Sequence, residues 1–485
     1  MSALRWFAGA LLALVLAGPA AAAENGEWLS WGHDNQLTNA IASKELTPAS
    51  VRRLKRVWQS KLDGAVFASP LAAPVAGRTT LFAATEGGSV YALDAASGRI
   101  VWQRELGIVD TAECGPWGIT STGAIDRSRG LLYEISADGK LHALDLATGA
   151  DTAGFPRVLV SDFEYEYVWG GLRIANGRLY VPVASYCDAG PPDGPFPDGR
   201  LFSIPLADPD ALTEWQPVEG PGNLGGVWGW GGVSVDPATG TVFTAVGNSH
   251  VYSPACGCYV DNAPYGNQVV ALTPDLSRVL DAQAPNLPVT DDDDFGAAPV
   301  LFQPKGCPPL AAANNKIGSL YIWNRRNLAS GTIVPPIPLS DGVNAFVGTP
   351  SWSASRQAVF DAQSVLYRGG VRLGNGVRAF HVEAGCTFRP TWSAALGDGN
   401  QATPLVAGDV VFATGGTPGG FFGLSAASGA LLWKTTTVGP TVAPLISVGG
   451  AVYGADTEGW VYAFRPPTPA PRRPAAPPPP WRLVR

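Results

Sequence analysis

Twelve residues decide the fold of this chain: Tyr91-Ala92-Leu93-Asp94-Ala95-Ala96-Ser97-Gly98-Arg99-Ile100-Val101-Trp102. A strand of alternating pattern ends in a small residue, a tight turn follows, and a second strand ends in tryptophan. The Asp94 carboxylate and the Ser97 hydroxyl can bond the amides of the turn, and Gly98 supplies its positive φ. The stretch therefore predicts a β-hairpin that ends in a tryptophan.

This pattern occurs eight times along the chain. Residues 422–433 repeat all of it and residues 141–149 its first part, and weaker copies lie at 202–215, 270–280, 321–331, 380–392 and, truncated, 462–464. Several copies follow a further strand pair that opens with a small residue and proline: Ser69-Pro70, Ala298-Pro299, Thr349-Pro350, Thr403-Pro404 and Ala443-Pro444. Four short strands in about 40–50 residues make one blade of a β-propeller. The sequence therefore predicts an all-β fold, an eight-bladed β-propeller over residues 24–465.

The last copy of the pattern predicts how the ring closes. It stops at Phe464 without its glycine and tryptophan, whereas Leu54-Lys55-Arg56-Val57-Trp58 is a strand that ends in tryptophan and has no hairpin of its own. Pairing these two segments removes an exposed sheet edge. We therefore expect residues 54–62 to pair beside residues 462–464 and to complete the last blade.

Composition excludes several other classes of protein. Apolar residues make up 46% of the chain, which is enough for a large core. The chain also has 59 glycines and 43 prolines, which interrupt long helices and exclude a helical bundle. The net charge of −7 disfavours binding to a phosphate backbone, so we do not expect nucleic acid as a partner.

We predict that the two ends of the chain lie outside the propeller. Residues 1–5 give a short basic start, residues 6–18 an apolar run, and residues 19–23 the small residues that signal peptidase reads. We expect a signal peptide over residues 1–23 and a periplasmic or secreted protein without a transmembrane segment in its mature form; a retained anchor is the alternative. Residues 466–485 are rich in proline and predict a disordered tail.

Cysteine and histidine usage limits the chemistry. Six cysteines fit an oxidising compartment with one to three disulfides, whose pairing cannot be read from the sequence. The spacing of Cys256-Gly257-Cys258 suits neither a zinc knuckle nor the attachment of a c-type haem. No HExxH pair, G-x-S-x-G elbow, phosphate-binding loop or dinucleotide fingerprint is present. A serine hydrolase or a nucleotide enzyme is therefore not expected.

The repeat resembles the tryptophan-docking repeat of pyrroloquinoline quinone (PQQ) proteins. That family includes eight-bladed quinoprotein alcohol dehydrogenases, proteins similar to polyvinyl-alcohol dehydrogenase, and non-enzymatic outer-membrane assembly propellers of the BamB type. The segment Trp31-Gly32-His33-Asp34-Asn35 resembles the dehydrogenase opening. The resemblance implies a propeller of the quinoprotein alcohol dehydrogenase type, with PQQ and Ca²⁺ as cofactors, that oxidises a small-molecule alcohol or sugar. The alternative is a propeller without cofactor that acts as a binding or assembly scaffold for a protein partner.

Four positions match site motifs of the family. Trp228, in Gly225-Gly226-Val227-Trp228-Gly229-Trp230, resembles the flat floor under the quinone, and Asn248 resembles a calcium ligand. Asp294 ends a run of four aspartates before Phe295 and resembles the general base and calcium neighbour; Lys316 resembles the cation that bonds the quinone oxygens. In that role Asp294 takes the hydroxyl proton of the substrate. The alternatives are a docking tryptophan at 228, an ordinary turn at 248 and a solvated acidic loop at 291–294.

The chain also departs from the family pattern. The calcium-binding glutamate of the dehydrogenases is replaced by the stretch Ser185-Tyr186-Cys187-Asp188-Ala189-Gly190, in which Asp188 is the candidate metal ligand. The adjacent cysteine pair of many members is missing, and only Cys114 lies in that region.

Overall fold

The computed structural model describes residues 26–111, 115–186, 190, 195–285, 294–341, 348–368, 370–397, 402–415 and 419–467. These residues form short strands almost throughout, together with one helix, α1 (Pro48–Val51), and one 3-10 helix, η1 (Leu328–Ser330). The predicted signal peptide, most of the predicted tail, Cys114, Cys187 and Asp188 lie outside the described residues. No helix of the described part is long and apolar enough to cross a membrane.

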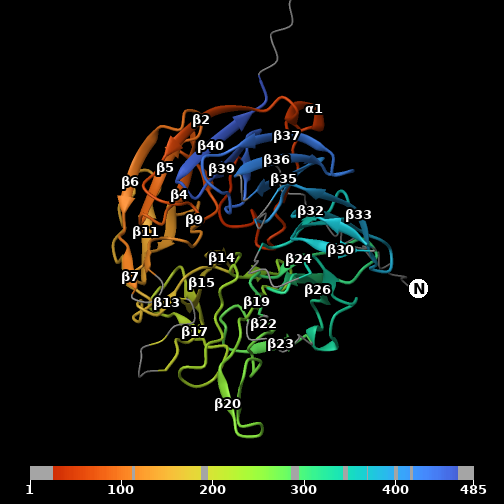
Figure 1. The fold of residues 1–485 in the computed structure, drawn as a ribbon. Coiled ribbons are helices and arrows are strands. Elements are labelled where there is room, and N and C mark those ends of the chain that lie inside the picture. The colour runs from red at the N-terminus through yellow and green to blue at the C-terminus, as the bar shows by residue number, and fades with distance from the viewer. Residues whose placement is uncertain are drawn as a thin grey trace, which may run out of the picture.

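Eight antiparallel sheets follow one another around a ring and confirm the predicted propeller (Figure 1). We number them as blades 1 to 8 in chain order. Blades 1 to 4 consist of β3 (Leu71–Val75), β4 (Arg78–Ala84), β5 (Ser89–Asp94) and β6 (Ile100–Glu105); β9 (Ala124–Asp126), β10 (Leu131–Ile135), β11 (Lys140–Asp145) and β12 (Arg157–Val158); β14 (Arg173–Ala175), β15 (Arg178–Ser185), β16 (Arg200–Pro205) and β17 (Thr213–Trp215), with β13 (Glu166–Tyr167) also paired to β15; and β18 (Ser234–Val235), β19 (Val242–Ala245), β22 (Val269–Leu272) and β23 (Val279–Gln283).

The remaining blades have the same order of strands. Blades 5 to 8 consist of β24 (Val300–Phe302), β25 (Leu310–Asn314), β26 (Ser319–Asn324) and β27 (Ile337–Pro338); β28 (Ser351–Ser353), β29 (Ala358–Gln363), β32 (Gly376–Val382) and β33 (Phe388–Ala395); β34 (Leu405–Ala407), β35 (Val410–Gly415), β36 (Gly420–Ser425) and β37 (Leu431–Thr436); and β38 (Ile446–Val448), β39 (Ala451–Ala455), β40 (Trp460–Arg465) and β2 (Lys55–Lys61).

Three two-stranded hairpins interrupt this order: β7 (Val109–Thr111) with β8 (Gly115–Trp117), β20 (Val251–Ser253) with β21 (Cys258–Val260), and β30 (Leu366–Arg368) with β31 (Val371–Leu373). The β20 hairpin projects beyond the rim of the ring (Figure 1). A disulfide joins Cys256 to Cys258 in its turn, and a second joins Cys307 to Cys386 between blades 5 and 6.

Each predicted repeat copy contains the third strand of one blade. In blade 1 the turn after β5 has the predicted chemistry, since Asp94 Oδ1 accepts the backbone N–H groups of Ala96 and Ser97 at 3.2 and 2.9 Å and Gly98 has a φ of 72°. At three joints the tryptophan at the end of one blade lies on the turn of the next. Trp102 donates its Nε1–H to the carbonyl of Leu146 at 3.1 Å and covers Gly149, where a Cβ would lie 2.7 Å from the indole. The same Trp–Gly docking joins Trp58 to Gly98 and Trp392 to Gly429.

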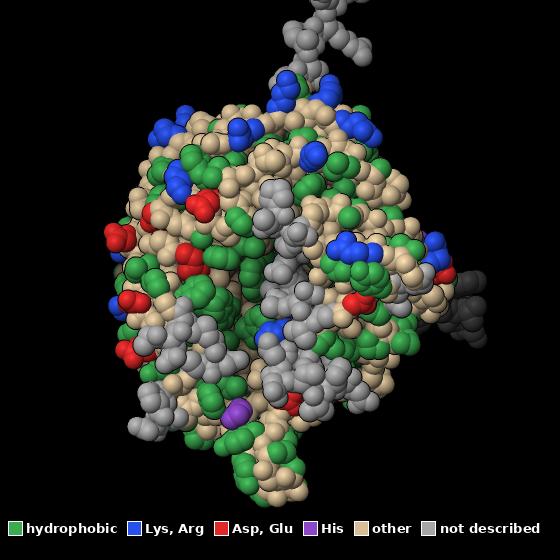
Figure 2. All heavy atoms as spheres, in the orientation of Figure 1, with side chains coloured by type: hydrophobic (Ala, Val, Ile, Leu, Met, Phe, Trp, Pro, Cys, Tyr) green, Lys and Arg blue, Asp and Glu red, His purple; other side chains and the backbone are tan. Residues whose placement is uncertain are grey.

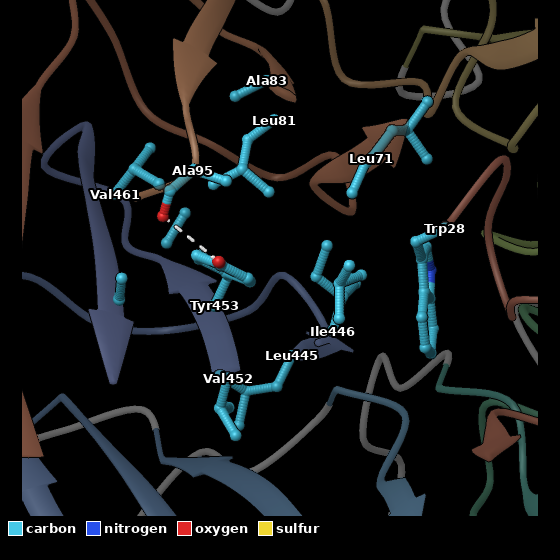
Figure 3. Close-up of a cluster of buried hydrophobic side chains, with 14 of the residues drawn as sticks. Trp28, Leu71, Leu81, Ala83, Ala95, Leu445, Ile446, Val452, Tyr453 and Val461 are labelled. Atoms are coloured by element: carbon cyan, nitrogen blue, oxygen red, sulfur yellow. Dashed lines mark hydrogen bonds between the residues drawn. The ribbon is translucent and has the colours of Figure 1, made fainter. Parts of the chain in front are cut away.

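The ring closes as the sequence predicts. Strand β2 pairs antiparallel with β40, and Trp58 stands opposite Ala463. Figure 3 shows the buried cluster at this joint, in which Leu445, Ile446 and Val452 of blade 8 lie opposite Leu71 and Leu81 of blade 1. The Tyr453 hydroxyl also donates to the carbonyl of Ala95 at 3.2 Å across the joint.

The segment before β2 forms an inner belt, residues 28–41, that the sequence analysis did not predict. It contacts the first strand of one blade after another, from blade 1 to blade 7. Its polar contacts, in chain order, are Trp28 with Ala72, Leu29 with Ile125, Trp31 with Arg173, Asn35 with Val235, Gln36 with Leu301, Thr38 with Trp352, and Asn39 with Val406. It ends in β1 (Ala40–Ile41), which pairs in parallel with β34. The belt thus ties seven blades together from the inside.

Candidate functional site

A cavity of about 330 Å³ lies among loops of blades 1 to 5, and aromatic side chains dominate its walls. It is lined by Phe67, Trp117, Thr120, Trp169, Ala184, Ser185, Gly226, Trp228, Trp230, Gly247, Asn248, Asp294 and Lys316. Trp230 packs edge-on against Trp31 of the inner belt, with ring centroids 6.0 Å apart. Figure 2 shows a basic side chain at the centre of one face of the ring, among hydrophobic side chains. Among the described residues of this lining, Asp294 and Lys316 are the charged ones.

Asp294 is held from two sides. Its side chain is almost fully buried, because it precedes Phe295, which packs in the core of blades 4 and 5. Trp228 donates its Nε1–H to Oδ2 at 2.8 Å, and Lys316 Nζ lies 2.9 Å from Oδ1. The backbone N–H of Lys316 also donates to the carbonyl of Asp294 at 2.9 Å. The carboxylate therefore has a fixed orientation in the cavity wall.

Lys316 lies in the turn between β25 and β26, and its side chain is 14% exposed. Its ammonium is 4.6 Å from the centroid of the Trp228 ring, in cation–π distance. Trp228 therefore does not make the docking contact of the repeat tryptophans. Its N–H is bonded to Asp294, and its ring forms part of the cavity.

A glycine keeps space open beside this group. A Cβ on Gly247 would lie 3.0 Å from Asp294 Oδ2 and 3.2 Å from Trp228 Cδ1, which is tighter than ordinary packing. The N–H of Gly247 donates to the carbonyl of Gly226 at 2.8 Å, and Gly225 donates to the carbonyl of Asn248 at 2.9 Å. These bonds fix Asn248 against the loop that carries Trp228.

A second wall is aromatic and was missed by the sequence analysis. Trp117 and Trp169 meet edge-to-face at 5.1 Å, and Trp169 donates its Nε1–H to the carbonyl of Ser185 at 2.8 Å. Tyr167 stacks on Tyr186 behind them at 4.4 Å. Burial raises the pKa of Tyr167 well above its usual value, so its hydroxyl stays protonated. The density of aromatic residues between 165 and 169 was the one signal for this wall in the sequence.

Four of the five predicted site residues thus line one cavity: Trp228, Asn248, Asp294 and Lys316. The fifth, Asp188, and the aspartates at 291–293 lie outside the described residues. The described residues fit a planar aromatic ligand, given the indole walls and the space beside Gly247. Two of them, Asn248 and Asp294, carry the side-chain amide or carboxylate oxygen that calcium prefers, whereas Ca²⁺ takes six to eight oxygens. Within the described ranges, no group of three or more His, Cys, Asp or Glu side chains could hold a metal ion.

Comparison with known proteins gives two family matches. Residues 28–165 match the β-propeller domain of glucose, ethanol and alcohol dehydrogenases, and residues 345–468 match the outer membrane protein assembly factor BamB. The cavity residues from Trp169 to Lys316 lie between the two matched regions.

Individual relatives are distant. The chain is 25% identical over 286 residues to the dehydrogenase subunit of a quinone-dependent alcohol dehydrogenase from Gluconobacter oxydans, which covers 53% of the chain and 37% of that relative. The chain thus spans well under half of that protein's length. It is 24% identical over 477 residues to polyvinylalcohol dehydrogenase from a Pseudomonas species, covering 88% of the chain and 71% of the relative. The crystal structure of quinohemoprotein alcohol dehydrogenase from Comamonas testosteroni superposes with a TM-score of 0.70 at 18% identity, covering 94% of this chain and 83% of that one. This structural likeness shows the fold.

Proposed function

The chain is a divergent PQQ-repeat propeller, and from that premise we propose that it is a periplasmic or secreted quinoprotein oxidoreductase that oxidises an alcohol or a sugar. One observation carries the proposal. An indole face, a buried carboxylate and an ammonium, from Trp228, Asp294 and Lys316, meet within hydrogen-bond or cation–π distance in one cavity.

The residues present fit PQQ as the bound group. PQQ is a planar, aromatic tricarboxylate, so it suits a cavity with indole walls and one ammonium. Trp228 would contact its face, Lys316 would bond its oxygens, and Gly247 leaves the space that a side chain would fill. When bound, PQQ supplies the two-electron acceptor that this chain's own side chains lack.

Asp294 is the general base of the proposed reaction. Its carboxylate accepts the hydroxyl proton of the substrate, and the N–H of Trp228 and the ammonium of Lys316 keep it oriented toward the cavity. Lys316 also stabilises negative charge that develops beside it during oxidation. The aromatic wall of Trp117 and Trp169 excludes water from this side and strengthens both interactions.

The test has a binding step and a turnover step. Purified protein is titrated with PQQ, with Ca²⁺ and with a chelator in parallel, and the loaded protein is then assayed for dye-linked oxidation of primary alcohols, aldoses and polyvinyl alcohol. We expect binding of PQQ and turnover of at least one substrate. Loss of binding in chelator supports the calcium role predicted for Asn248, Asp294 and Asp188; binding that does not depend on Ca²⁺ contradicts it.

A second candidate is a scaffold propeller without a cofactor. The match of residues 345–468 to an outer membrane assembly factor favours it. Absence of PQQ binding in the titration would replace the enzyme proposal with this one.

A further inference from the structure

A carboxylate that the proposed reaction does not use lies behind the cavity wall. Glu86 follows β4, and its Oε2 accepts the N–H of Gly118 at 3.0 Å. Its Oε1 accepts the hydroxyl of Thr120, a buried residue that lines the cavity. The Thr120 oxygen also lies 2.8 Å from the hydroxyl of Tyr167, which donates to the carbonyl of Gly118 at 2.7 Å. Glu86 and the cavity are therefore joined through one hydroxyl group.

The direction of the Thr120 hydrogen bond depends on the charge of Glu86. An ionised carboxylate only accepts, so the single Thr120 proton is committed to Glu86. A protonated Glu86 donates to the Thr120 oxygen instead and frees the Thr120 proton. The freed proton can then be donated to the Tyr167 oxygen 2.8 Å away or, in its place, to a stronger acceptor in the cavity such as a carboxylate. Thr120 is thus a donor toward the cavity only when Glu86 is neutral.

The surroundings of Glu86 favour its neutral form. Among the described residues, the phenols of Tyr167 and Tyr186 face Glu86, and Asp63 accepts the hydroxyl of the neighbouring Thr85 at 2.6 Å. Within the described residues, Glu86 forms no ion pair with a basic side chain. Burial raises its pKa above the usual value, although the bonds from Thr120 and Gly118 act in the opposite direction.

We propose that Thr120 is a carboxylate-binding position of the cavity, and that protonation of Glu86 switches it on. An aromatic polycarboxylate then binds with uptake of a proton, because a neutral Glu86 both provides the donor and removes a negative charge next to the ligand. The inference rests on the proposed function in taking PQQ as that ligand. Glu86 acts through Thr120 and is a positioning residue.

Calorimetric titration of the apoprotein with PQQ tests this without turnover. Titrations in two buffers of different ionisation enthalpy, repeated from pH 5 to pH 9, give the number of protons taken up. We expect uptake to rise toward about one proton per PQQ above the pKa of Glu86, and affinity to fall by up to about tenfold per pH unit there. Glu86→Gln should take up no such proton and bind with little dependence on pH, since its amide donates to Thr120 at every pH.

Three further variants complete the test. Thr120→Val should lower PQQ affinity by roughly five- to tenfold, as for one lost hydrogen bond, and Thr120→Ser should restore it. Glu105→Gln, which changes an exposed carboxylate of the same blade, is the matched control. If the parent binds PQQ without taking up a proton, or if Glu86→Gln takes up as many protons as the parent, the inference is overturned and the proposed function stays intact. Failure of the parent to bind PQQ overturns both.

Discussion

Two arcs of the ring differ in how their blades are joined. The regular arc, residues 28–165 and 345–468, contains the family matches and the three Trp–Gly docking contacts. The cavity arc, residues 166–344, does not repeat this contact at the joint between blades 3 and 4. There the carbonyl of Pro274 accepts the hydroxyls of Tyr180 and Ser203 in place of an indole N–H. Most of the cavity lining comes from this second arc.

The comparison indicates that the repeat contributes stability, whereas the ligand site depends on residues outside the repeat. Docking contacts hold the blades at a regular spacing, and a ring that contained only these contacts would have the same turn at every joint. At the joint between blades 3 and 4 the cavity arc has hydroxyl bonds in place of the docking contact, and the same arc supplies Trp228, Asp294 and Lys316 to the cavity. We therefore expect changes in the regular arc to alter mainly stability, and changes in the cavity arc to alter mainly PQQ binding or turnover.

Removal of residues 26–62 should have the largest effect. It deletes the inner belt and β2, so blade 8 loses its fourth strand and seven blades lose their shared contacts. We expect loss of cooperative unfolding, measured by circular dichroism during heating. Removal of residues 468–485 is the control and should leave the melting curve unchanged. A belt-deleted protein that melts like the parent contradicts ring closure.

Asp294→Asn should have the largest effect on activity. The amide keeps the size of the side chain and removes the proton acceptor, so turnover in the dye-linked assay should fall by about 10²–10⁴-fold, or about 3–5 kcal/mol. PQQ affinity should change far less, because the indole walls remain. The control is Asp208→Asn, an exposed carboxylate of blade 3. If both variants lose turnover equally, Asp294 is not the base.

The ionisation of Glu134, in the regular arc, should affect the stability of the protein and leave turnover unchanged. It is fully buried in blade 2, and burial raises its pKa to about 8. Its contribution to stability is therefore present below the usual pKa of glutamate and is lost as the pH rises through 8. We expect the free energy of unfolding in urea to fall by up to about 4 kcal/mol between pH 5 and pH 9, and to fall less in Glu134→Gln. An equal fall in both proteins would show that Glu134 stays ionised.

Two glycine substitutions compare the arcs directly. Gly149→Ala places a methyl group 2.7 Å from the Trp102 indole at a φ of 72°, and should cost about 1–3 kcal/mol of stability with PQQ affinity unchanged. Gly247→Ala should lower PQQ affinity and leave stability almost unchanged, since its methyl group would press on Asp294 and Trp228 in the cavity wall. Chemical denaturation and PQQ titration measure the two effects. If both substitutions change stability alone, the division between the arcs is wrong.

Trp228→Ala should weaken ligand binding and have the smallest effect on stability. Loss of the stacking face should weaken PQQ binding by about 0.5–1.5 kcal/mol beyond the area lost and leave the blades folded. Titration calorimetry of the parent and the variant measures the change, and equal affinities would refute the assignment of Trp228.

The fold could be predicted because its signals are local. The turn of Asp94 to Gly98 and the tryptophan that follows each lie within a few residues, and the missing last strand revealed the closure. The inner belt could not be predicted, because most of its bonds join backbone groups that any residue has. Trp228 and Asp294 were found by their resemblance to known motifs. Glu86 and Thr120 stand in no such motif and meet only in the folded ring.

The inner belt also sets a limit on the timing of folding. Ala40 pairs with Val406, and Trp58 stands opposite Ala463, so nearly the whole chain separates the partners. The start of the belt can therefore bind blades 1 and 2 early in synthesis, whereas β1 and β2 wait for blades 7 and 8, which are made last. Contacts of such long sequence separation slow folding and expose unpaired strand edges in the meantime. The incomplete ring is therefore prone to aggregate during synthesis. A chaperone that binds the early blades should raise the yield of folded protein more than one that binds the completed ring.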